Sequence, residues 1–408
     1  MLTREENELL TRVGPGTPMG ETLRRYWIPI VMPDEVPEPG CDPVRVKLLG
    51  EELVAFRDRA GRVGLIDEFC PHRGASLYYA RTADCGLQCI YHGWTVDANG
   101  TTIETPNESN ARLWEGKKLI AAYPTREACG VIWAYMGPPE RTPEFPAFPW
   151  NVRTHVHAKK VMLDCNFVQS VEGGIDSSHL SWLHQSNLPS AGEASLSRRD
   201  QAPRLEFEDM PYGFRYGAVR QAAGGNQYVR ITPFIMPWYT IVPFVADQTQ
   251  AAHAWVPIDD EHNWAFTFNY TFDDEPLPPE NWTHPYELVD RFHKLRTRGN
   301  RHLQDRAAMR EGNWTGIPGI PDQDAGIQES MKPIFDRSRE HLGGADLAVI
   351  HARALLLASV KAVQEGRDPV GIGMDFPTDQ IRCVVEVVPG DIPWRNLGLP
   401  TKARAEIS

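Results

Sequence analysis

Short runs of aliphatic and β-branched residues, separated by glycines and charged residues, make up the first quarter of the chain. Each run has the length of a single strand. The runs are Val44–Leu49, Glu52–Asp58, Val63–Phe69 and Trp94–Asp97. The last run leads into Asn99-Gly100, a pair that is typical of tight hairpin turns. The pattern therefore predicts a domain built on antiparallel sheet.

A proline-rich stretch interrupts this pattern between Gly137 and Pro149. Segments dense in proline form semi-rigid linkers, because the ring fixes the backbone and removes a hydrogen-bond donor. We therefore place a boundary within this stretch. It divides the chain into a first domain at residues 1–145 and a second domain at residues 146–408.

The second domain mixes the two hydrophobic periods. Apolar spacing typical of a helix extends from Phe167 to about His184, and it recurs at Tyr286–Met309 and Ala345–Gln364. Between the first two helices, Arg204–Val256 returns to strand-like runs. The second domain is therefore predicted to be α+β.

Composition narrows the functional classes. The 408 residues include 42 Lys and Arg against 54 Asp and Glu, which gives 42 − 54 = −12 at pH 7. A net negative charge disfavours a nucleic acid partner, because nucleic acids are themselves negatively charged. No apolar run approaches the length of a membrane span, and Met1–Leu10 is too charged for a secretion signal, so we expect a cytoplasmic protein without membrane attachment. The seven cysteines are too few for a disulfide scaffold, which points to metal or redox chemistry.

Two loops each combine one cysteine with one histidine. Cys70-x-His72 is followed, after 16 residues, by Cys89-x2-His92. A [2Fe-2S] cluster of Rieske type needs two thiolates on one iron and two imidazoles on the other. Two loops that each supply one ligand of each kind meet this need, so the pattern favours a Rieske cluster.

The alternative for the same four residues is a structural zinc site with two cysteines and two histidines. It fits less well, because zinc loops usually space their paired ligands by two or more residues and pair like with like. Cys85 lies close to the second loop but has no second histidine in register, so we interpret it as a free thiol.

A second group of metal-binding residue types follows the linker in Asp176-Ser177-Ser178-His179 and His184. On an ideal helix, two residues five positions apart point about 140° away from each other. His179 and His184 therefore share a metal only if the helix ends or contains a π-bulge between them, and such irregularities are frequent at functional sites. Taken singly, His179 is more simply interpreted as an ordinary core or surface histidine, and it is the pair beside an acid that favours a metal site.

Together, the two groups resemble the large subunit of the Rieske non-haem iron oxygenases over nearly the whole chain. Three flanking segments are similar to the phthalate dioxygenase branch, whose members are homotrimers without a small subunit. These segments are Leu2-Thr3 through Gly14-Pro15-Gly16-Thr17-Pro18-Met19-Gly20, Ser177-Ser178-His179-Leu180 and Gln328-Glu329-Ser330-Met331. The resemblance implies an antiparallel β Rieske domain followed by a helix-grip (START-like) α+β catalytic domain.

The same resemblance implies roles for single residues. Cys70, His72, Cys89 and His92 would hold the [2Fe-2S] cluster, and His179 and His184 would bind a mononuclear Fe(II). Asp176 would be the catalytic acid that hydrogen-bonds a cluster histidine of the neighbouring subunit.

The third iron ligand is expected to be a carboxylate that completes a 2-His-1-carboxylate face. Asp324 matches the place where relatives have it, Asp322 is its rival, and Glu329 and Asp336 are further candidates. Glu172 occupies a position where naphthalene-type relatives have asparagine, and its role is open between a carboxylate that supports the site and a simple helix acid.

The resemblance also implies the reaction. The protein would be a terminal oxygenase in aromatic hydrocarbon catabolism that uses O2 to dihydroxylate an aromatic carboxylate such as a phthalate, benzoate or phenoxybenzoate. A monooxygenase or an O- or N-demethylase in the same fold is the first alternative, and an electron carrier without oxygenase activity is the second.

Electrons must come from another protein, because the chain has neither a G-x-G-x-x-G after a strand nor a plant-type cluster motif. We expect a separate NAD(P)H-dependent reductase with flavin and its own [2Fe-2S] cluster, and a homotrimer or stacked trimers. An anionic substrate in an acidic protein needs a local cation. The residues considered for substrate binding are Ser177, Ser178, Arg204, Arg220 and Arg230, although a surface ion pair is the simpler interpretation of each arginine.

Overall fold

The computed structural model describes residues 2–192, 195–242 and 249–399, and the chain divides into two compact units. One unit is Val13–Pro143, and the other combines Met1–Arg12 with Glu144–Ser408. The predicted first domain began at residue 1, whereas the first twelve residues group with the second unit. The reason is the helix α1 (Arg4–Thr11), whose Asn7 side chain donates to the carbonyl of Phe335.

The unit Val13–Pro143 consists of small antiparallel sheets. Their strand orders are β1-β11-β10, β2-β3-β4-β9 and β5-β6-β7-β8. It contains α2 (Pro18–Leu23) and the strands β1 (Trp27–Val31), β2 (Val44–Leu48), β3 (Glu51–Arg57), β4 (Val63–Asp67), β5 (Arg81–Ala83), β6 (Gly86–Gln88), β7 (Thr95–Val96), β8 (Thr102–Glu104), β9 (Ala122–Tyr123), β10 (Thr125–Ala128) and β11 (Val131–Tyr135). The four strand runs predicted from the sequence correspond to β2, β3, β4 and β7.

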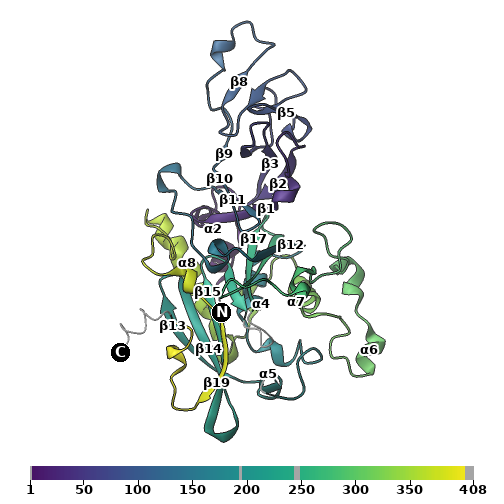
Figure 1. Ribbon diagram of the computed structural model, residues 1–408, viewed down its shortest axis with the longest axis vertical. Helices are drawn as coiled ribbons and strands as arrows, with labels where there is room; N and C mark the ends of the chain where they lie inside the picture. Colours follow the sequence, from purple (N-terminus) through teal and green to yellow (C-terminus); the bar gives the residue numbers. More distant parts are fainter. Residues whose placement is uncertain (1, 193–194, 243–248, 400–408) are drawn as a thin grey trace. The chain divides into compact units, whose positions relative to one another are not determined.

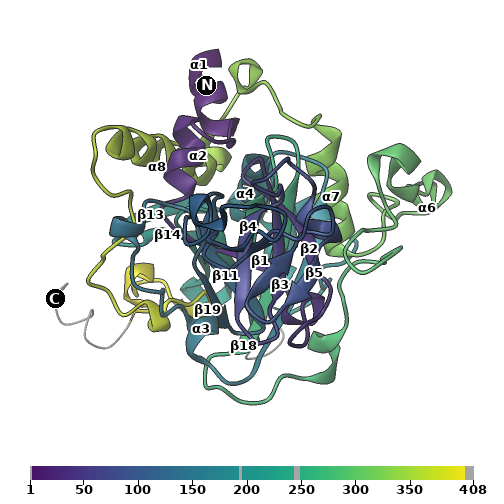
Figure 2. The same ribbon diagram turned by 90° about the horizontal axis from the view of Figure 1, so that it is seen from above.

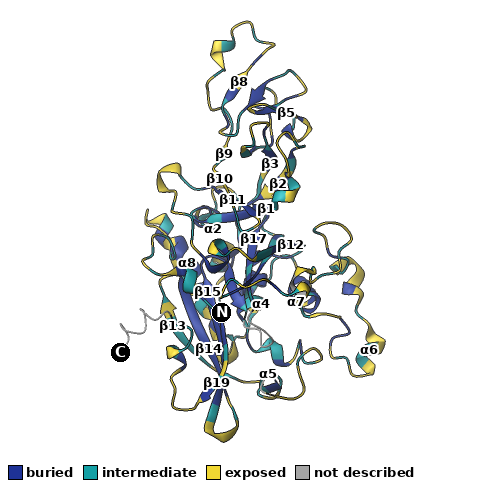
Figure 3. Ribbon diagram, in the orientation of Figure 1, coloured by how far each residue is buried: buried dark blue, intermediate teal, exposed yellow. Residues whose placement is uncertain are grey.

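The other unit is built on a large antiparallel sheet with the order β12-β18-β17-β16-β15-β14-β13, in which β19 also pairs with β15. The strands of this sheet are largely buried (Figure 3). The strands are β12 (Val156–Leu163), β13 (Arg204–Met210), β14 (Gly213–Gln221), β15 (Asn226–Ile235), β16 (Tyr239–Val242), β17 (Thr249–Pro257), β18 (Asn263–Thr271) and β19 (Val384–Pro389). The helices are α3 (Pro149–Val152), α4 (Phe167–Ile175), α5 (Leu196–Arg199), α6 (Arg306–Arg310), α7 (Ile320–Ser330) and α8 (Leu347–Gln364).

Helix α4 lies against the sheet, and the candidate site begins at its C-terminal end. It packs on β16 and β17, and it also contacts α7 and α8 (Figure 1). The end-on view shows α1 beside α8 (Figure 2). Asn166 caps α4 by accepting a hydrogen bond from the backbone of Val168, and Asp176 follows the last turn as C-cap. The end of the helix therefore fixes the position of Asp176 and of His179, which follows it.

The predicted helix through His184 is wrong in its length. Helix α4 ends at Ile175, and His179 begins a separate single turn of 3₁₀-helix, His179–Ser181. Gly173 and Gly174 are weak helix formers, and the Asp176 carboxylate accepts hydrogen bonds from the backbone and hydroxyl of Ser178, which competes with helix continuation. Neither histidine lies on a regular helix.

The predicted helix Tyr286–Met309 is also wrong over most of its length, although the one at Ala345–Gln364 is confirmed as α8. The Asp290 carboxylate accepts from the backbone N–H groups of Phe292 and His293, which closes a local turn in place of a helical one. Further on, Arg301–Leu303 adopt positive φ angles. Only α6 and the 3₁₀-helix Arg298–Leu303 are helical there among the residues described.

Within the described ranges, no helix combines the length and the apolar character that crossing a bilayer requires.

Candidate metal centres

The two Cys/His loops of the first unit have the same backbone geometry. In the first loop, the Cys70 N–H donates to Ala75 and the Cys70 carbonyl accepts from Gly74. In the second loop, the Cys89 N–H donates to Trp94 and the Cys89 carbonyl accepts from Gly93. Both glycines have positive φ, at 71° and 79°, a conformation that glycine adopts without strain.

The side chains of the loops converge as a cluster site requires. Cys70 and Cys89 are buried free thiols in one apolar core, and burial followed by the neighbouring Cys89 raises the pKa of Cys70 to about 11. The rings of His72 and His92 lie 4.5 Å apart between centroids, and His72 stacks on Trp94. Two buried sulfurs behind two half-buried imidazoles fit the two ends of a Rieske cluster better than a zinc site.

In the second unit, the structure brings His179, His184 and Asp324 together. One ligand atom from each lies within 4.8 Å of the others. The two Nε2 atoms are 3.1 Å apart, and Asp324 Oδ1 is 3.6 Å from Nε2 of His179 and 3.2 Å from Nε2 of His184. Ligands about 2.1 Å from a common metal and at right angles to each other are about 3 Å apart. The spacing fits three neighbouring positions on one metal.

Hydrogen bonds on the far side of each ring set the tautomers. His184 Nδ1 lies 2.8 Å from Gln323 Oε1, which only accepts, so Nδ1 carries the proton and Nε2 presents a lone pair. His179 Nδ1 faces Asp176 Oδ2 at 3.5 Å. Two imidazole lone pairs and the Asp324 carboxylate therefore point at one place. Such an arrangement is electrostatically unfavourable without a cation at the centre.

The orientation of Gln323 follows from its own contacts, because its amide nitrogen lies within hydrogen-bond distance of three acceptors. These are Asn187 Oδ1 at 2.9 Å, Thr315 Oγ1 at 3.1 Å and the Ile317 carbonyl at 2.8 Å. The oxygen of the amide must then face His184. Gln323 is 1% exposed, so this orientation is held by the protein interior.

Asp176 is held beside the centre by Ser178 and His179. The Ser178 N–H and hydroxyl donate to Asp176 Oδ1 at 2.7 and 2.6 Å. Burial opposes ionisation of Asp176, but its bonds to His179 and Ser178 hold its pKa below the ordinary value. Burial also opposes charge on His179, but Asp176 and Asp324 outweigh it and raise the pKa of His179.

The rival acids have other partners. Glu329 forms a buried ion pair with Lys294 at 2.5 Å. Asp322 lies 3.5 Å from Arg296, and burial raises its pKa to about 6. Asp336 caps the 3₁₀-helix Arg337–Arg339 by accepting from Ser338.

The substrate candidates separate into two kinds. Arg204 is 64% exposed and pairs with Glu206, and the Ser178 hydroxyl is used by Asp176. Arg220 is 1% exposed, and its Nε donates to the carbonyl of Asp200. Its Nη1 and Nη2 have no hydrogen-bond partner among the residues described, and the same holds for the buried hydroxyl of Ser177. Burial and then the nearby Arg230 lower the pKa of Arg220 to about 10.

The sheet register places Arg220 and Arg230 on the face that contacts the end of α4. The segment that follows this helix, residues 176–184, carries Asp176, His179 and His184 and is called the metal loop. Alternate residues on β14 share a face, and cross-strand partners do so too, so Tyr216, Arg220 and Arg230 point the same way. The Tyr216 hydroxyl donates to the carbonyl of Ile175 at 2.5 Å, next to the C-cap of α4. The buried arginines therefore face the region of Asp176.

Gln323 and Tyr216 are site residues that sequence reasoning missed. Gln323 directly precedes Asp324, and a polar residue at that position of a helix is ordinary, so no local pattern marks it. Tyr216 lies in an alternating strand run, where an aromatic residue is typical of a core. Only the tertiary contacts reveal their positions.

Two family models match the chain. A model of the Rieske [2Fe-2S] domain matches residues 26–124, and a model described as LigXa C-terminal domain like matches residues 134–407. Together they cover most of both compact units.

Several curated relatives align over almost the full length. The phthalate 4,5-dioxygenase oxygenase subunit of Pseudomonas putida is 41% identical, with 97% of this chain and 94% of that protein covered. The 3-chlorobenzoate-3,4-dioxygenase oxygenase subunit of Comamonas testosteroni is 35% identical, with 97% and 98% covered. The 5,5'-dehydrodivanillate O-demethylase oxygenase subunit of a Sphingobium species is 33% identical, with 92% and 84% covered.

Solved structures share the fold at low identity. A mutant of NdmA from Pseudomonas putida with theobromine superposes with a TM-score of 0.61 at 18% identity, covering 88% of this chain and 99% of that one. The terminal oxygenase of carbazole 1,9a-dioxygenase from Nocardioides aromaticivorans gives 0.57 at 18% identity, with 90% and 98% covered. With the family models, these likenesses confirm the predicted fold class of a β Rieske domain followed by an α+β catalytic domain.

Proposed function

The chain belongs to the Rieske non-haem iron oxygenases, and we propose that it is a terminal oxygenase that dihydroxylates a small aromatic carboxylate. Membership confirms the predicted enzyme class and both cofactors, a [2Fe-2S] cluster and a mononuclear iron. When bound, the cluster stores an electron and the iron activates dioxygen. Cys70, His72, Cys89 and His92 would hold the first group, and His179, His184 and Asp324 would hold the second.

One observation carries the choice of substrate class: the buried Arg220, on the sheet face that Tyr216 links to the end of α4. A guanidinium with two buried NH2 groups that lack partners among the described residues is costly unless an anion completes its hydrogen bonds. A planar carboxylate fits a guanidinium through two parallel hydrogen bonds. An aromatic ring attached to that carboxylate would then be anchored on the sheet face that Tyr216 links to the start of the metal loop.

The proposed roles of the remaining residues follow from their contacts. Asp176 keeps its charge beside His179, and in a homotrimer or stacked trimers it would hydrogen-bond a cluster histidine of the neighbouring subunit and carry the electron to the iron. Ser178 positions Asp176, and Ser177 offers a buried hydroxyl to the substrate. Arg204 has no role in this scheme, because it is exposed and paired.

Electron supply would come from a separate NAD(P)H-dependent reductase that carries flavin and its own [2Fe-2S] cluster. Two relatives are named as dioxygenase subunits and a third as an O-demethylase subunit. Demethylation of an aromatic acid is therefore the second candidate, and it is compatible with the same arginine.

A screen of aromatic acids tests the substrate class and the reaction together. Protein with a chemically reduced cluster is mixed with O2 and a benzoate, phthalate, phenoxybenzoate or methoxybenzoate, and the products are identified after one turnover. We expect a cis-diol from an aromatic carboxylate, at a rate that its neutral carboxamide does not match. Formaldehyde from a methoxybenzoate would instead establish the demethylase, and equal turnover of acid and amide would contradict a carboxylate site.

Replacing Arg220 with glutamine tests the anchor itself. We expect R220Q to weaken binding of the preferred carboxylate on the order of 100-fold, because the variant loses a charged hydrogen-bonded contact in a buried site. Equilibrium dialysis of the labelled acid measures this without turnover. R204Q removes an exposed arginine from the neighbouring strand and should leave the dissociation constant within about twofold. Equal affinities of R220Q and R204Q would show that the substrate lies elsewhere.

A further inference from the structure

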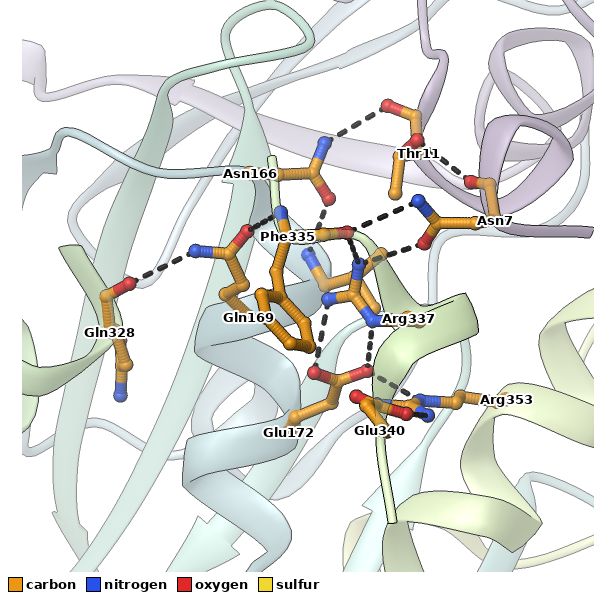
Figure 4. A network of polar contacts seen from close by, with 11 residues as sticks. Asn7, Thr11, Asn166, Gln169, Glu172, Gln328, Phe335, Arg337, Glu340 and Arg353 are labelled. Atoms are coloured by element: carbon orange, nitrogen blue, oxygen red, sulfur yellow. Dashed lines mark hydrogen bonds and ion pairs between the residues drawn. The ribbon is translucent and has the colours of Figure 1, made fainter. Parts of the chain in front are cut away.

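Glu172, in the last turns of α4, is held by two buried arginines. Arg337 donates to its two carboxylate oxygens from Nε and Nη2, at 2.8 and 3.0 Å, and Arg353 donates from Nε at 2.6 Å (Figure 4). The two arginine side chains are 0% and 4% exposed. Burial opposes ionisation of Glu172, but the two guanidinium groups outweigh it and hold its pKa below the ordinary value.

The arginines tie this carboxylate to other parts of the unit. Arg337 also reaches Asn7 of α1, and Arg353 comes from α8 and binds both oxygens of Glu340. Figure 4 shows the resulting chain of contacts from the N-terminal helix across α4 to α8. Removing one member of such a network leaves buried charge without a partner, so its geometry is strongly specified.

The last turn of α4, which Glu172 holds in place, has little helix stability of its own. The next two residues are Gly173 and Gly174, and glycine is among the weakest helix formers. A Cβ on Gly173 would come within 2.4 Å of the Gln328 side chain, and one on Gly174 within 1.8 Å of Trp255. The glycines therefore allow close packing against α7 and β17, while the helix end has little stability of its own.

Glu172 is also directly connected to the metal loop. Its backbone carbonyl accepts the N–H of Asp176 at 3.1 Å, which sets where the chain leaves the helix. His179 follows three residues later, and its Nδ1 faces Asp176. A small rotation of the last turn would move both residues relative to His184 and Asp324, which are placed by other segments.

We propose that Glu172 is a positioning residue of the mononuclear centre: through Arg337 and Arg353 it locks the last turn of α4 and so places Asp176 and His179. Nothing in this role requires Glu172 to contact metal, substrate or oxygen. The role depends only on the metal centre and is independent of which substrate the enzyme uses.

The test compares two isosteric variants of the same network. E172Q weakens the link to α4, whereas E340Q weakens an equally buried carboxylate on Arg353 that does not touch α4. Mononuclear metal is removed from the holoenzyme with chelator, and Co²⁺ is titrated by equilibrium dialysis. Electron paramagnetic resonance of bound Co²⁺ reports its geometry, because the oxidised cluster gives no signal. The visible spectrum of the cluster and the thermal unfolding midpoint are recorded for each variant.

We expect E172Q to weaken Co²⁺ binding on the order of 10- to 100-fold and to change the Co²⁺ signal, as is usual when the support of a metal ligand is lost. The Co²⁺ dissociation constant of E340Q should stay within about twofold of that of the unmodified protein. If E172Q does not fold, the double variant E172Q/R337Q, which also removes the opposing charge, replaces it with the same expectation. An equal loss of Co²⁺ affinity in the Glu172 and Glu340 variants would show that the network only stabilises the fold, which contradicts a positioning role. Unchanged Co²⁺ binding in both variants would also overturn the proposal.

Discussion

Replacing His179 with alanine is expected to abolish turnover while leaving the cluster intact. The variant keeps His184 and Asp324 but loses one of the three ligand atoms within 4.8 Å of one another. Loss of one ligand of a three-ligand site lowers metal affinity on the order of a thousandfold. The proposed cluster ligands Cys70 and Cys89 lie in the other compact unit. Iron content and the visible spectrum measure the two centres separately.

The matched control is His262, a histidine of the same unit that is 39% exposed and pairs with Asp259. H262A should retain both centres and normal turnover. A loss of cluster absorbance in H179A, with H262A normal, would contradict the separation of the two metal sites. Full iron occupancy in H179A would contradict the assignment of His179 as a ligand.

The second large effect is expected for D176N, which keeps the shape of the side chain and removes its charge. The amide oxygen still accepts from Ser178, so we expect iron binding to fall only slightly. Asparagine cannot act as the anionic partner of a protonated imidazole, so electron transfer should slow on the order of 100-fold. Stopped-flow reoxidation of the reduced cluster with substrate and O2 measures that rate.

Asp209 provides the comparison, because it is 82% exposed and pairs with His351 on the surface. D209N should reoxidise its cluster at the normal rate. If D176N also does so, Asp176 does not carry electrons between subunits. If D176N loses its iron instead, the residue supports the metal and the proposed bridging role is unnecessary.

Local patterns allowed much of the site to be predicted from the sequence. The four residues of the Cys/His loops lie within two short segments whose turns are set by nearby glycines, so their spacing alone encodes the geometry. His179 and His184 were recognisable as a pair from the family resemblance, because a spacing of five residues does not bring two side chains together on the helix that the sequence predicts. Asp324 was predicted from motif position alone, because 139 residues separate it from His184 and no local pattern distinguishes it from Asp322. The tertiary fold makes that distinction, by turning Asp322 toward Arg296.

Helix lengths were predicted less well, because side chains compete for backbone hydrogen bonds. The apolar spacing continues beyond Ile175, yet Asp176 and Ser178 close a local turn instead. Asp290 does the same in the segment predicted as a second helix. The sequence left the role of Glu172 open for another reason: its partners, Arg337 and Arg353, lie more than 160 residues away.

In the proposed enzyme, one chain holds a two-iron cluster and a separate ferrous site with an open face. Quantitative analysis of iron and acid-labile sulfide in the purified, iron-loaded protein tests it most directly. We expect about three iron atoms and about two sulfides per chain. About two irons with two sulfides would leave only an electron carrier, and zinc in a colourless protein would contradict both centres.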